Sequence, residues 1–279
     1  MVEGIVLGTL QGITEWLPIS SEGVLILAKT HLFNNGESLS ELIGFALFLH
    51  LGTFLAAAWY LRDDVISLLK MLLTPHRLLE RGEGLFRFRG KKGEMENMLR
   101  FLVVSTFVSG VIGYFLLEIF LPSVEESVMV TTKFVTGGIG IFLLITGFLE
   151  FQAKRKKGHK ELDRLSDKDG LLLGVVQGFA ALPGFSRSGL TISTLLLRKF
   201  DEVTALRLSF LMSLPIVFGG NIVFNANESV INITSMFGLV FSFVFGIITI
   251  HILFKIARKI NFAYFVLAFG FLTIASVFI

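Results

Sequence analysis

Long apolar stretches dominate the pattern of hydrophobic and polar positions along the 279-residue chain. A helix that crosses the hydrocarbon core of a bilayer needs about 20 mostly apolar residues. Six stretches are long enough and are predicted to be transmembrane helices: Leu42–Leu61, Leu99–Leu121, Met129–Phe151, Val203–Asn225, Thr234–Phe254 and Phe262–Ile279. The pattern therefore predicts an all-α polytopic membrane protein.

Two further apolar segments, Glu3–Thr30 and Gly170–Lys199, are interrupted at their middle by a proline and several hydroxyl groups. Residues 8–23, GTLQGITEWLPISSEG, are echoed about 166 positions later by residues 174–189, GVVQGFAALPGFSRSG. Proline breaks a helix, and paired broken helices in two halves of a chain are typical of a binding site at membrane depth. We therefore predict two re-entrant helical hairpins.

The composition agrees with a membrane protein, since 53% of residues are hydrophobic and 17% are charged, with a mean hydropathy of +0.75. The absence of cysteine excludes a disulfide framework and a thiolate metal site. A net charge of +3, concentrated in loops, argues against nucleic-acid binding. No cleavable signal peptide is expected, because Glu3, Gln11 and Glu15 interrupt the first apolar run.

Loop charges predict the orientation, because Lys and Arg are retained on the cytoplasmic side. Segments 62–92, 154–168 and 255–259 are basic, whereas 34–41, 122–127 and 226–233 contain no Lys or Arg. Six spans fit this alternation only if the first hairpin enters and leaves on the outside and the second on the inside.

Each half then contains three crossings and one hairpin, so the second half is inverted relative to the first. The expected architecture is one integral membrane domain, 1–279, in which halves 1–153 and 169–279 are joined by a basic cytoplasmic linker, 154–168. Residues 77–96 are interpreted as a solvated loop with a short amphipathic helix.

Candidate chemistry begins with Gln11 and Glu15, which are four residues apart and share one helix face. A carboxylate within a membrane segment is costly and usually lines a polar site. The alternative is that Glu15 pairs with a basic residue and only holds the hairpins together.

Ser20 and Ser21 follow Pro18 and precede the second half-helix. A serine at this place is a common N-cap, and Glu22 suits the first helical turn. One serine can cap the helix while the other reacts.

Residues 183–191, PGFSRSGLT, combine a guanidinium, three hydroxyls and glycine-freed amides just before a predicted helix. Helix N-termini and arginine bind phosphate, so Arg187, Ser186, Ser188 and Thr191 are predicted to form an anion site. The alternative, an arginine snorkelling to the interface, fits poorly with a deep hairpin tip.

His50 lies within the first full span, where a hydrogen-bonded packing role is favoured over a chemical one. No pair of histidines has the spacing of metal ligands. Arg207 lies near a span end, where snorkelling suffices to explain it.

These passages resemble the undecaprenyl-diphosphate phosphatase family, also called the bacitracin-resistance proteins. Residues 11–21, QGITEWLPISS, match the family's Glu/Gln-x-x-x-Glu motif and following Pro-x-Ser-Ser, and residues 183–191 match its Pro-Gly-x-Ser-Arg-Ser-x-x-Thr motif. Leu208-Ser-Phe-Leu211 with Pro215 resembles the family's next helix. The resemblance covers essentially the whole chain.

The resemblance implies a plasma-membrane enzyme that removes the terminal phosphate of a long polyprenyl diphosphate, so that the lipid carrier is recycled for envelope glycan synthesis. It implies six spans, two hairpins and a reaction centre facing outward. Glu15 would activate Ser21 as the nucleophile, and Arg187 would hold the diphosphate with Ser186, Ser188 and Thr191; Gln11 and Ser20 complete the expected site. A divalent cation, Mg²⁺ or Ca²⁺, is expected from the resemblance, and no organic cofactor.

One departure stands at Val24, where the bacterial pattern has a histidine. That histidine would be a natural general acid or base. Three explanations remain open: Glu15 acts alone, Glu22 or His50 takes its place, or this branch is slow or no longer a phosphatase.

The competing function is a flippase that moves polyprenyl phosphate across the membrane with the same head-group site, because inverted repeats are frequent in transporters. The pairing of a buried carboxylate with a hydroxyl-rich turn favours chemistry over release. An ion channel or a purely structural scaffold is disfavoured, because no continuous polar stripe in the sequence supports it.

Overall fold

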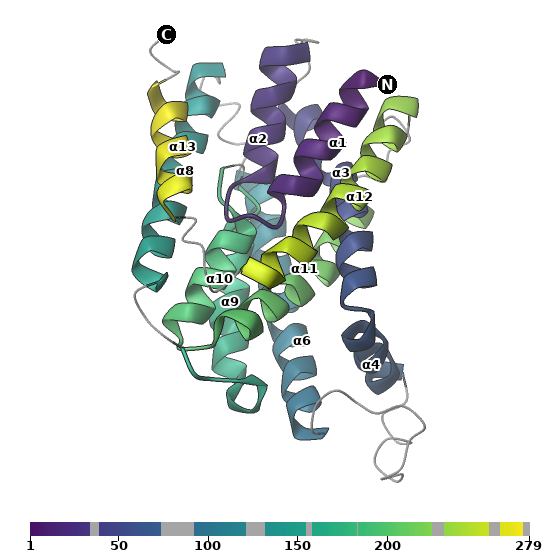
Figure 1. Ribbon diagram of the computed structural model, residues 1–279, viewed down its shortest axis with the longest axis vertical. Helices are drawn as coiled ribbons and strands as arrows, with labels where there is room; N and C mark the ends of the chain where they lie inside the picture. The colour runs from purple at the N-terminus through teal and green to yellow at the C-terminus, as the bar shows by residue number, and fades with distance from the viewer. Residues whose placement is uncertain are drawn as a thin grey trace.

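The described part of the chain is built from α-helices. In the computed structural model (Figure 1) it comprises residues 1–33, 39–73, 92–120, 132–154, 158–182, 184–224, 232–256 and 263–275. Within these ranges the α-helices are α1 (Val2–Thr14), α2 (Ser21–Ala28), α3 (Leu39–Tyr60), α4 (Arg62–Leu73), α6 (Lys92–Phe115), α8 (Thr132–Lys154), α9 (Asp167–Phe179), α10 (Arg187–Leu197), α11 (Glu202–Phe224), α12 (Ile233–Ile256) and α13 (Ala263–Ala275). Short π-helical turns, η1 (Lys29–Phe33) and η2 (Leu116–Phe120), extend α2 and α6, and the 3-10 turn η3 (Leu162–Arg164) precedes α9. No strand occurs within these ranges, so the predicted all-α class is confirmed.

Four of the described helices are long and apolar enough to cross a membrane: α6, α8, α11 and α12. A fifth is obtained if α3 and α4, which are bent by 88° at Leu61, count as one span. The apolar part of α13, Val266–Ala275, is shorter. These helices are those of a multi-pass membrane protein. Both ends of the predicted span 262–279, and Pro183 in the second hairpin, lie outside the described residues.

The two broken segments share one local design. α1 ends at Thr14 and α2 begins after Ser20, whose Oγ accepts a hydrogen bond from the amide of Gly23 at 3.1 Å. In the second segment Ser186 caps α10 by accepting from the amide of Gly189 at 3.0 Å. A capping serine satisfies an amide that the first turn leaves without a partner, so each helix restarts where the hydroxyl cluster lies.

Each hairpin places its first helix against a long helix from the other part of the chain. α1 packs on α12, and α9 packs on α6. Glycines make these contacts close: a Cβ on Gly8 would lie 2.2 Å from the carbonyl oxygen of Gly238, and a Cβ on Gly174 would lie 2.7 Å from the Cβ of Val108. Small residues allow helix backbones to approach closely in membranes. In Figure 1, α1 and α2 occupy the upper part of the molecule and α9 and α10 the lower part.

Helix α4 differs from the sequence prediction, which assigned 62–92 to a basic loop. Asp64 on α4 is buried and accepts two hydrogen bonds from Arg207 of α11, one of them from Nε to Oδ2 at 2.7 Å. Arg207 therefore pairs with a carboxylate instead of snorkelling. Residues 74–91, which include most of the predicted amphipathic helix, lie outside the described residues.

Aromatic packing beneath the first hairpin fixes the residue next to Glu15. Trp16 is 1% exposed and lies with its ring centroid 4.5 Å from that of Phe210 on α11. Truncation of a buried tryptophan typically costs about 3–5 kcal/mol. Trp16 thus anchors the turn that follows α1, and the Glu15 backbone with it.

Candidate active site

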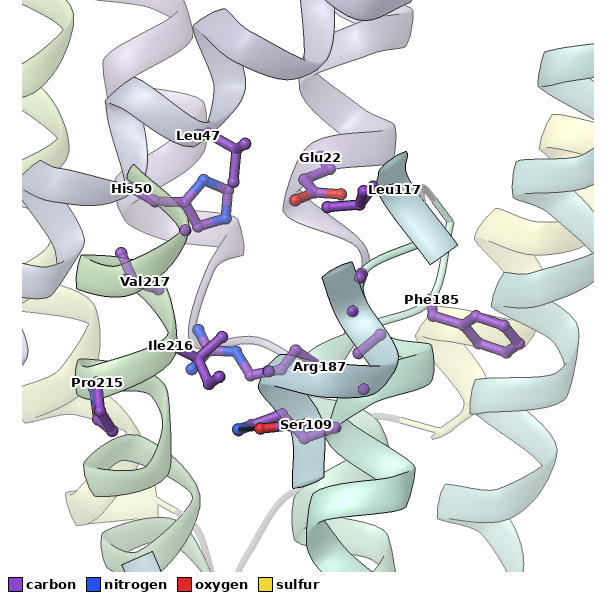
Figure 2. Close-up of a pocket in the computed structure, with 18 of the residues that line it drawn as sticks. Glu22, Leu47, His50, Ser109, Leu117, Phe185, Arg187, Pro215, Ile216 and Val217 are labelled. Carbon is purple, nitrogen blue, oxygen red and sulfur yellow. Dashed lines mark hydrogen bonds between the residues drawn. The ribbon is translucent and has the colours of Figure 1, made fainter. Parts of the chain in front are cut away.

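The two hairpin tips meet at a cavity of about 320 Å³. Its wall combines residues of both tips with α3, α6 and α11. Figure 2 shows Glu22 and His50 facing each other across the cavity, with Arg187 extending through its middle and Ser109 below. Glu15 and Ser21 also line it. Five of the ten site residues expected from the sequence therefore share one wall.

Glu15 is the centre of the site. Its side chain is 4% exposed, although it follows the last residue of α1 in the turn. Oε2 accepts hydrogen bonds from Ser21 Oγ at 2.6 Å and from Gln11 Nε2 at 3.0 Å. His50 Nε2 lies 2.9 Å from the same oxygen, and the guanidinium of Arg187 pairs with Oε1. One carboxylate thus links α1, α2, α3 and α10.

The two serines of the first tip have different partners. Ser20 Oγ caps α2 and also accepts from the amide of Gly184 in the second tip at 3.0 Å. Gly184 has φ of +106°, a conformation that favours glycine. Ser20 therefore joins the two tips, whereas Ser21 turns its hydroxyl to Glu15.

The second tip directs its arginine to the cavity and its hydroxyls to the protein. Ser188 Oγ donates to the carbonyl of Leu17 at 2.7 Å, and Ser186 Oγ lies 3.2 Å from Ser188 Oγ. Thr191 Oγ1 lies 2.7 Å from the hydroxyl of Ser209 on α11. These three hydroxyls brace the tip, and their predicted contact with substrate stays a prediction.

The position of Arg187 is compatible with both interpretations of the sequence, and its binding of an anion stays a prediction. It pairs with Glu15, as the alternative of a purely structural link expected, and it also faces the cavity. Its guanidinium carbon lies 5.8 Å from the centre of the Trp16 ring, within the range of a cation–π contact. The arginine is held at the tip and does not snorkel.

Comparison with known proteins identifies the family. The family model of the bacitracin resistance protein BacA matches residues 4–275. The chain belongs to the BacA family. Proteins named undecaprenyl-diphosphatase are similar along nearly their whole length: that of Methanococcoides burtonii is 42% identical, covering 99% of this chain and 98% of the relative. Those of Methanothrix thermoacetophila (33%; 98% and 96%) and Haloarcula marismortui (35%; 92% and 90%) are further relatives. The predicted family is confirmed.

The structure distinguishes the two residues that could substitute for the histidine that is replaced by Val24 in this chain. Of the two suggested substitutes, His50 contacts Glu15 directly, whereas Glu22 faces the cavity and has no hydrogen bond or ion pair among the described residues. Both side chains line the same cavity as Glu15 and Ser21, but only His50 shares a hydrogen-bonding oxygen with Ser21.

Two polar residues that line the cavity, Gln177 and Ser109, were not among the site residues predicted from the sequence. Gln177 donates from Nε2 to Ser109 Oγ at 3.1 Å, and both residues line the cavity. Gln177 occupies the place of Gln11 in the repeat, which was the available signal. Ser109 lies in an ordinary apolar span, and nothing in its sequence neighbourhood marks it.

Proposed function

We propose that this BacA protein hydrolyses a polyprenyl diphosphate of the undecaprenyl type to the monophosphate and inorganic phosphate, which recycles the lipid carrier. The observation that carries the proposal is the Ser21–Glu15–Arg187 arrangement inside a cavity at the meeting of the two hairpins. A hydroxyl next to a carboxylate base and an arginine is suited to phosphoryl transfer. The names of the relatives support the same activity.

In the first step Ser21 Oγ attacks the phosphorus of the terminal phosphate. Glu15 accepts the hydroxyl proton through the 2.6 Å hydrogen bond. The bond from phosphorus to the bridging oxygen breaks, and its electron pair leaves with the lipid monophosphate. Arg187 turns from Glu15 to the phosphate oxygens, where a guanidinium stabilises the charge of the transition state. The product on the protein is a phosphoserine.

In the second step water attacks the phosphorus of phosphoserine 21. The Ser21 oxygen leaves and takes back the proton held by Glu15, while both protons of the water depart with the inorganic phosphate, which leaves as dihydrogen phosphate. Glu15 and Ser21 return to their initial states. Hydrogen bonds of the hydroxyl groups of Ser186, Ser188 and Thr191 keep the second tip in place. Arg187 therefore presents the same donors in both steps.

A divalent cation, Mg²⁺ or Ca²⁺, fits this site only as a partner of the substrate. Among the residues that the structure describes, no group of three or more His, Cys, Asp or Glu could hold a metal ion by itself. Magnesium is commonly bound by one or two carboxylates together with substrate phosphates. Glu22, with a carboxylate that faces the cavity, would hold the ion, which would neutralise part of the diphosphate charge.

The lipid tail has a path out of the cavity between α6 and α11. Gly110 on α6 and Gly219 and Gly220 on α11 line the cavity, and a Cβ on any of them would meet nothing within 4 Å. Apolar side chains such as Leu117 and Val223 continue this wall. A polyprenyl chain can leave through such a gap while its diphosphate stays at Arg187.

The membrane arrangement belongs to the same proposal. The chain forms one integral membrane domain of two inverted halves, 1–153 and 169–279, joined by 154–168, with six spans and two re-entrant hairpins in the plasma membrane. The exchange of partners, with α1 on α12 and α9 on α6, supports the inverted relation. Leu117 and Val223 precede segments without Lys or Arg, which supports an opening to the outer side.

Phosphate release by the protein purified in detergent tests the function. Without a second compartment a flippase has no product, so the proposal expects inorganic phosphate from undecaprenyl diphosphate, and Ser21→Ala should lower the rate by about 10³-fold or more. Ser67→Ala on α4 serves as the control. No phosphate from the wild-type chain across a panel of prenyl diphosphates, with lipid movement in vesicles, would establish the flippase instead. Full activity in Ser21→Ala would exclude the proposed nucleophile.

A further inference from the structure

His50 is held at both nitrogens of its ring. It lies on α3, is 6% exposed and lines the cavity. Nδ1 is 2.6 Å from the carbonyl oxygen of Ala46, one turn earlier in the same helix, and Nε2 is 2.9 Å from Glu15 Oε2. Both ring nitrogens therefore have a polar partner within hydrogen-bonding distance.

The two partners of His50 determine where its protons lie. A backbone carbonyl can only accept, so Nδ1 must carry a proton. An ionised carboxylate also only accepts, so Nε2 must carry a proton when Glu15 is charged. With both nitrogens protonated the ring is a cation. The charged groups that share the cavity are Glu15 from the end of α1, Glu22 from α2 and Arg187 from α10. α11 and α12, which pack on α3, contribute no charged residue to the described lining.

The helix that carries His50 has anchors on α12 in addition to its packing on the first hairpin. Ser242 of α12 donates to the carbonyl of Leu49 at 2.7 Å, next to His50. Gly52 approaches α12 so closely that a Cβ there would lie 2.4 Å from the carbonyl oxygen of Leu239. His50 therefore reaches Glu15 from a helix that is held closely against α12.

Arg187 cannot hold Glu15 and the substrate phosphate with the same donors. When it turns to the phosphate, Glu15 Oε1 loses its partner, and the carboxylate is then held through Oε2 alone. Gln11 comes from the same helix and turn as Glu15, so it moves with it. His50 is the remaining partner from a separate span.

We propose that His50 is a positioning residue that keeps Glu15 Oε2 directed at Ser21 Oγ while Arg187 engages the substrate. The inference rests on the proposed function. It also gives this chain a histidine next to the proposed general base, Glu15, even though residue 24 is valine, because the imidazole comes from α3 instead of α2. Small errors in the geometry of a reacting pair can cost about 10²-fold in rate.

The test compares His50→Ala, which removes the donor, with His50→Gln, which keeps an amide donor but has no titrating proton. His50→Ala should lower kcat by about 10- to 100-fold and leave KM within about twofold, because the lost contact acts on the base and not on substrate binding. His50→Gln should recover most of this loss. It should also lack the fall in activity at alkaline pH that loss of the imidazolium proton causes in the wild type. His251→Gln, at an exposed histidine of α12, is the matched control.

The rate at which a fluorophosphonate labels Ser21, followed by intact mass, gives a second readout that needs no turnover. His50→Ala should slow labelling by a factor similar to its loss in kcat, and His50→Gln should restore it. Phosphate release by the wild type in the same preparation tests the proposed function separately. The labelling rate tests the role of His50 even if no phosphate is released. Equal labelling of wild type and His50→Ala, or equal losses in the Ala and Gln variants, would overturn the inference.

Discussion

At the scale of single residues, the site is organised by competition for one carboxylate. Glu15 receives donors from Gln11, Ser21, His50 and Arg187, and of these only Arg187 must turn away from Glu15 to hold the phosphate in the proposed reaction. A buried carboxylate with several donors is well satisfied at rest. In the proposed reaction, substrate binding would both recruit Arg187 and free Glu15 to act as a base.

Substitution of Arg187 by lysine tests the need for a guanidinium. Lysine keeps the charge but loses the planar donors that reach Glu15 at rest and phosphate in the reaction. We expect Arg187→Lys to lower kcat/KM by about 10²-fold, the usual loss when one set of transition-state donors is removed. Steady-state phosphate release measures it, with Arg164→Lys, at an exposed arginine outside the cavity, as the control. If Arg187→Lys keeps wild-type activity, a point charge is sufficient.

The residue chemistry was partly predictable from the sequence. Glu15, Ser21 and Arg187 could be selected as candidates because each stands in a short local pattern. A capping serine could be expected because capping is local, but the sequence did not decide between Ser20 and Ser21. The contact between His50 and Glu15 could not be predicted, because 35 positions separate the residues and only the tertiary packing of α3 against the tip joins them. Arg207 was misinterpreted for the same reason, since its partner Asp64 is remote in sequence.

At the scale of elements, the hairpins are positioned by glycine contacts. Gly4, Gly8 and Gly12 recur on one face of α1, and Gly170, Gly174 and Gly178 recur on one face of α9. The spacing indicates a close helix contact, but not with which helix. The structure assigns α12 and α6 as the partners.

The Gly8 contact can be tested through stability. Gly8→Ala should lower the midpoint of thermal unfolding in detergent, because its Cβ would lie 2.2 Å from a carbonyl oxygen of α12 and overpacking typically costs about 1–3 kcal/mol. Gly110→Ala is the matched control, because its Cβ would meet nothing within 4 Å. It should leave the midpoint unchanged or raise it, since alanine favours helix. Equal midpoints for wild type and Gly8→Ala would contradict the packing.

The gap between α6 and α11 makes a prediction about substrate length. Gly219→Leu fills open space on the cavity wall and should obstruct a polyprenyl tail. We expect its kcat/KM to fall about tenfold or more with undecaprenyl diphosphate and much less with a short-chain prenyl diphosphate, because only the long tail must pass the gap. Gly138→Leu on α8, where a Cβ also meets nothing, is the control outside the cavity lining. Equal losses with both substrates would show that the gap does not hold the tail.

At the scale of the whole molecule, the division of work between the hairpins follows from their unequal sequences. The position of Glu15 corresponds to Ala181 in the second copy, and the position of Ser21 corresponds to Arg187. The capping serines, the glycines and the glutamines are retained in both copies. The features that build a tip are therefore repeated, whereas the proposed base and nucleophile occur in one tip and the proposed phosphate-binding cation in the other. The proposed chemistry is therefore confined to the place where the tips meet.

Orientation in the membrane can be measured directly, because the chain contains no cysteine that would interfere with labelling. Single cysteines are placed at exposed positions, as His31→Cys and Asn232→Cys at one end and Lys70→Cys and Arg164→Cys at the other. Because basic segments are retained in the cytoplasm, a membrane-impermeant maleimide should label the first pair in intact cells and the second pair only after permeabilisation. His31 follows the first hairpin, so its labelling from outside shows on which side of the membrane that hairpin ends. Labelling of Lys70→Cys or Arg164→Cys in intact cells would show that the orientation is opposite to the predicted one, and would place the proposed reaction on the cytoplasmic side.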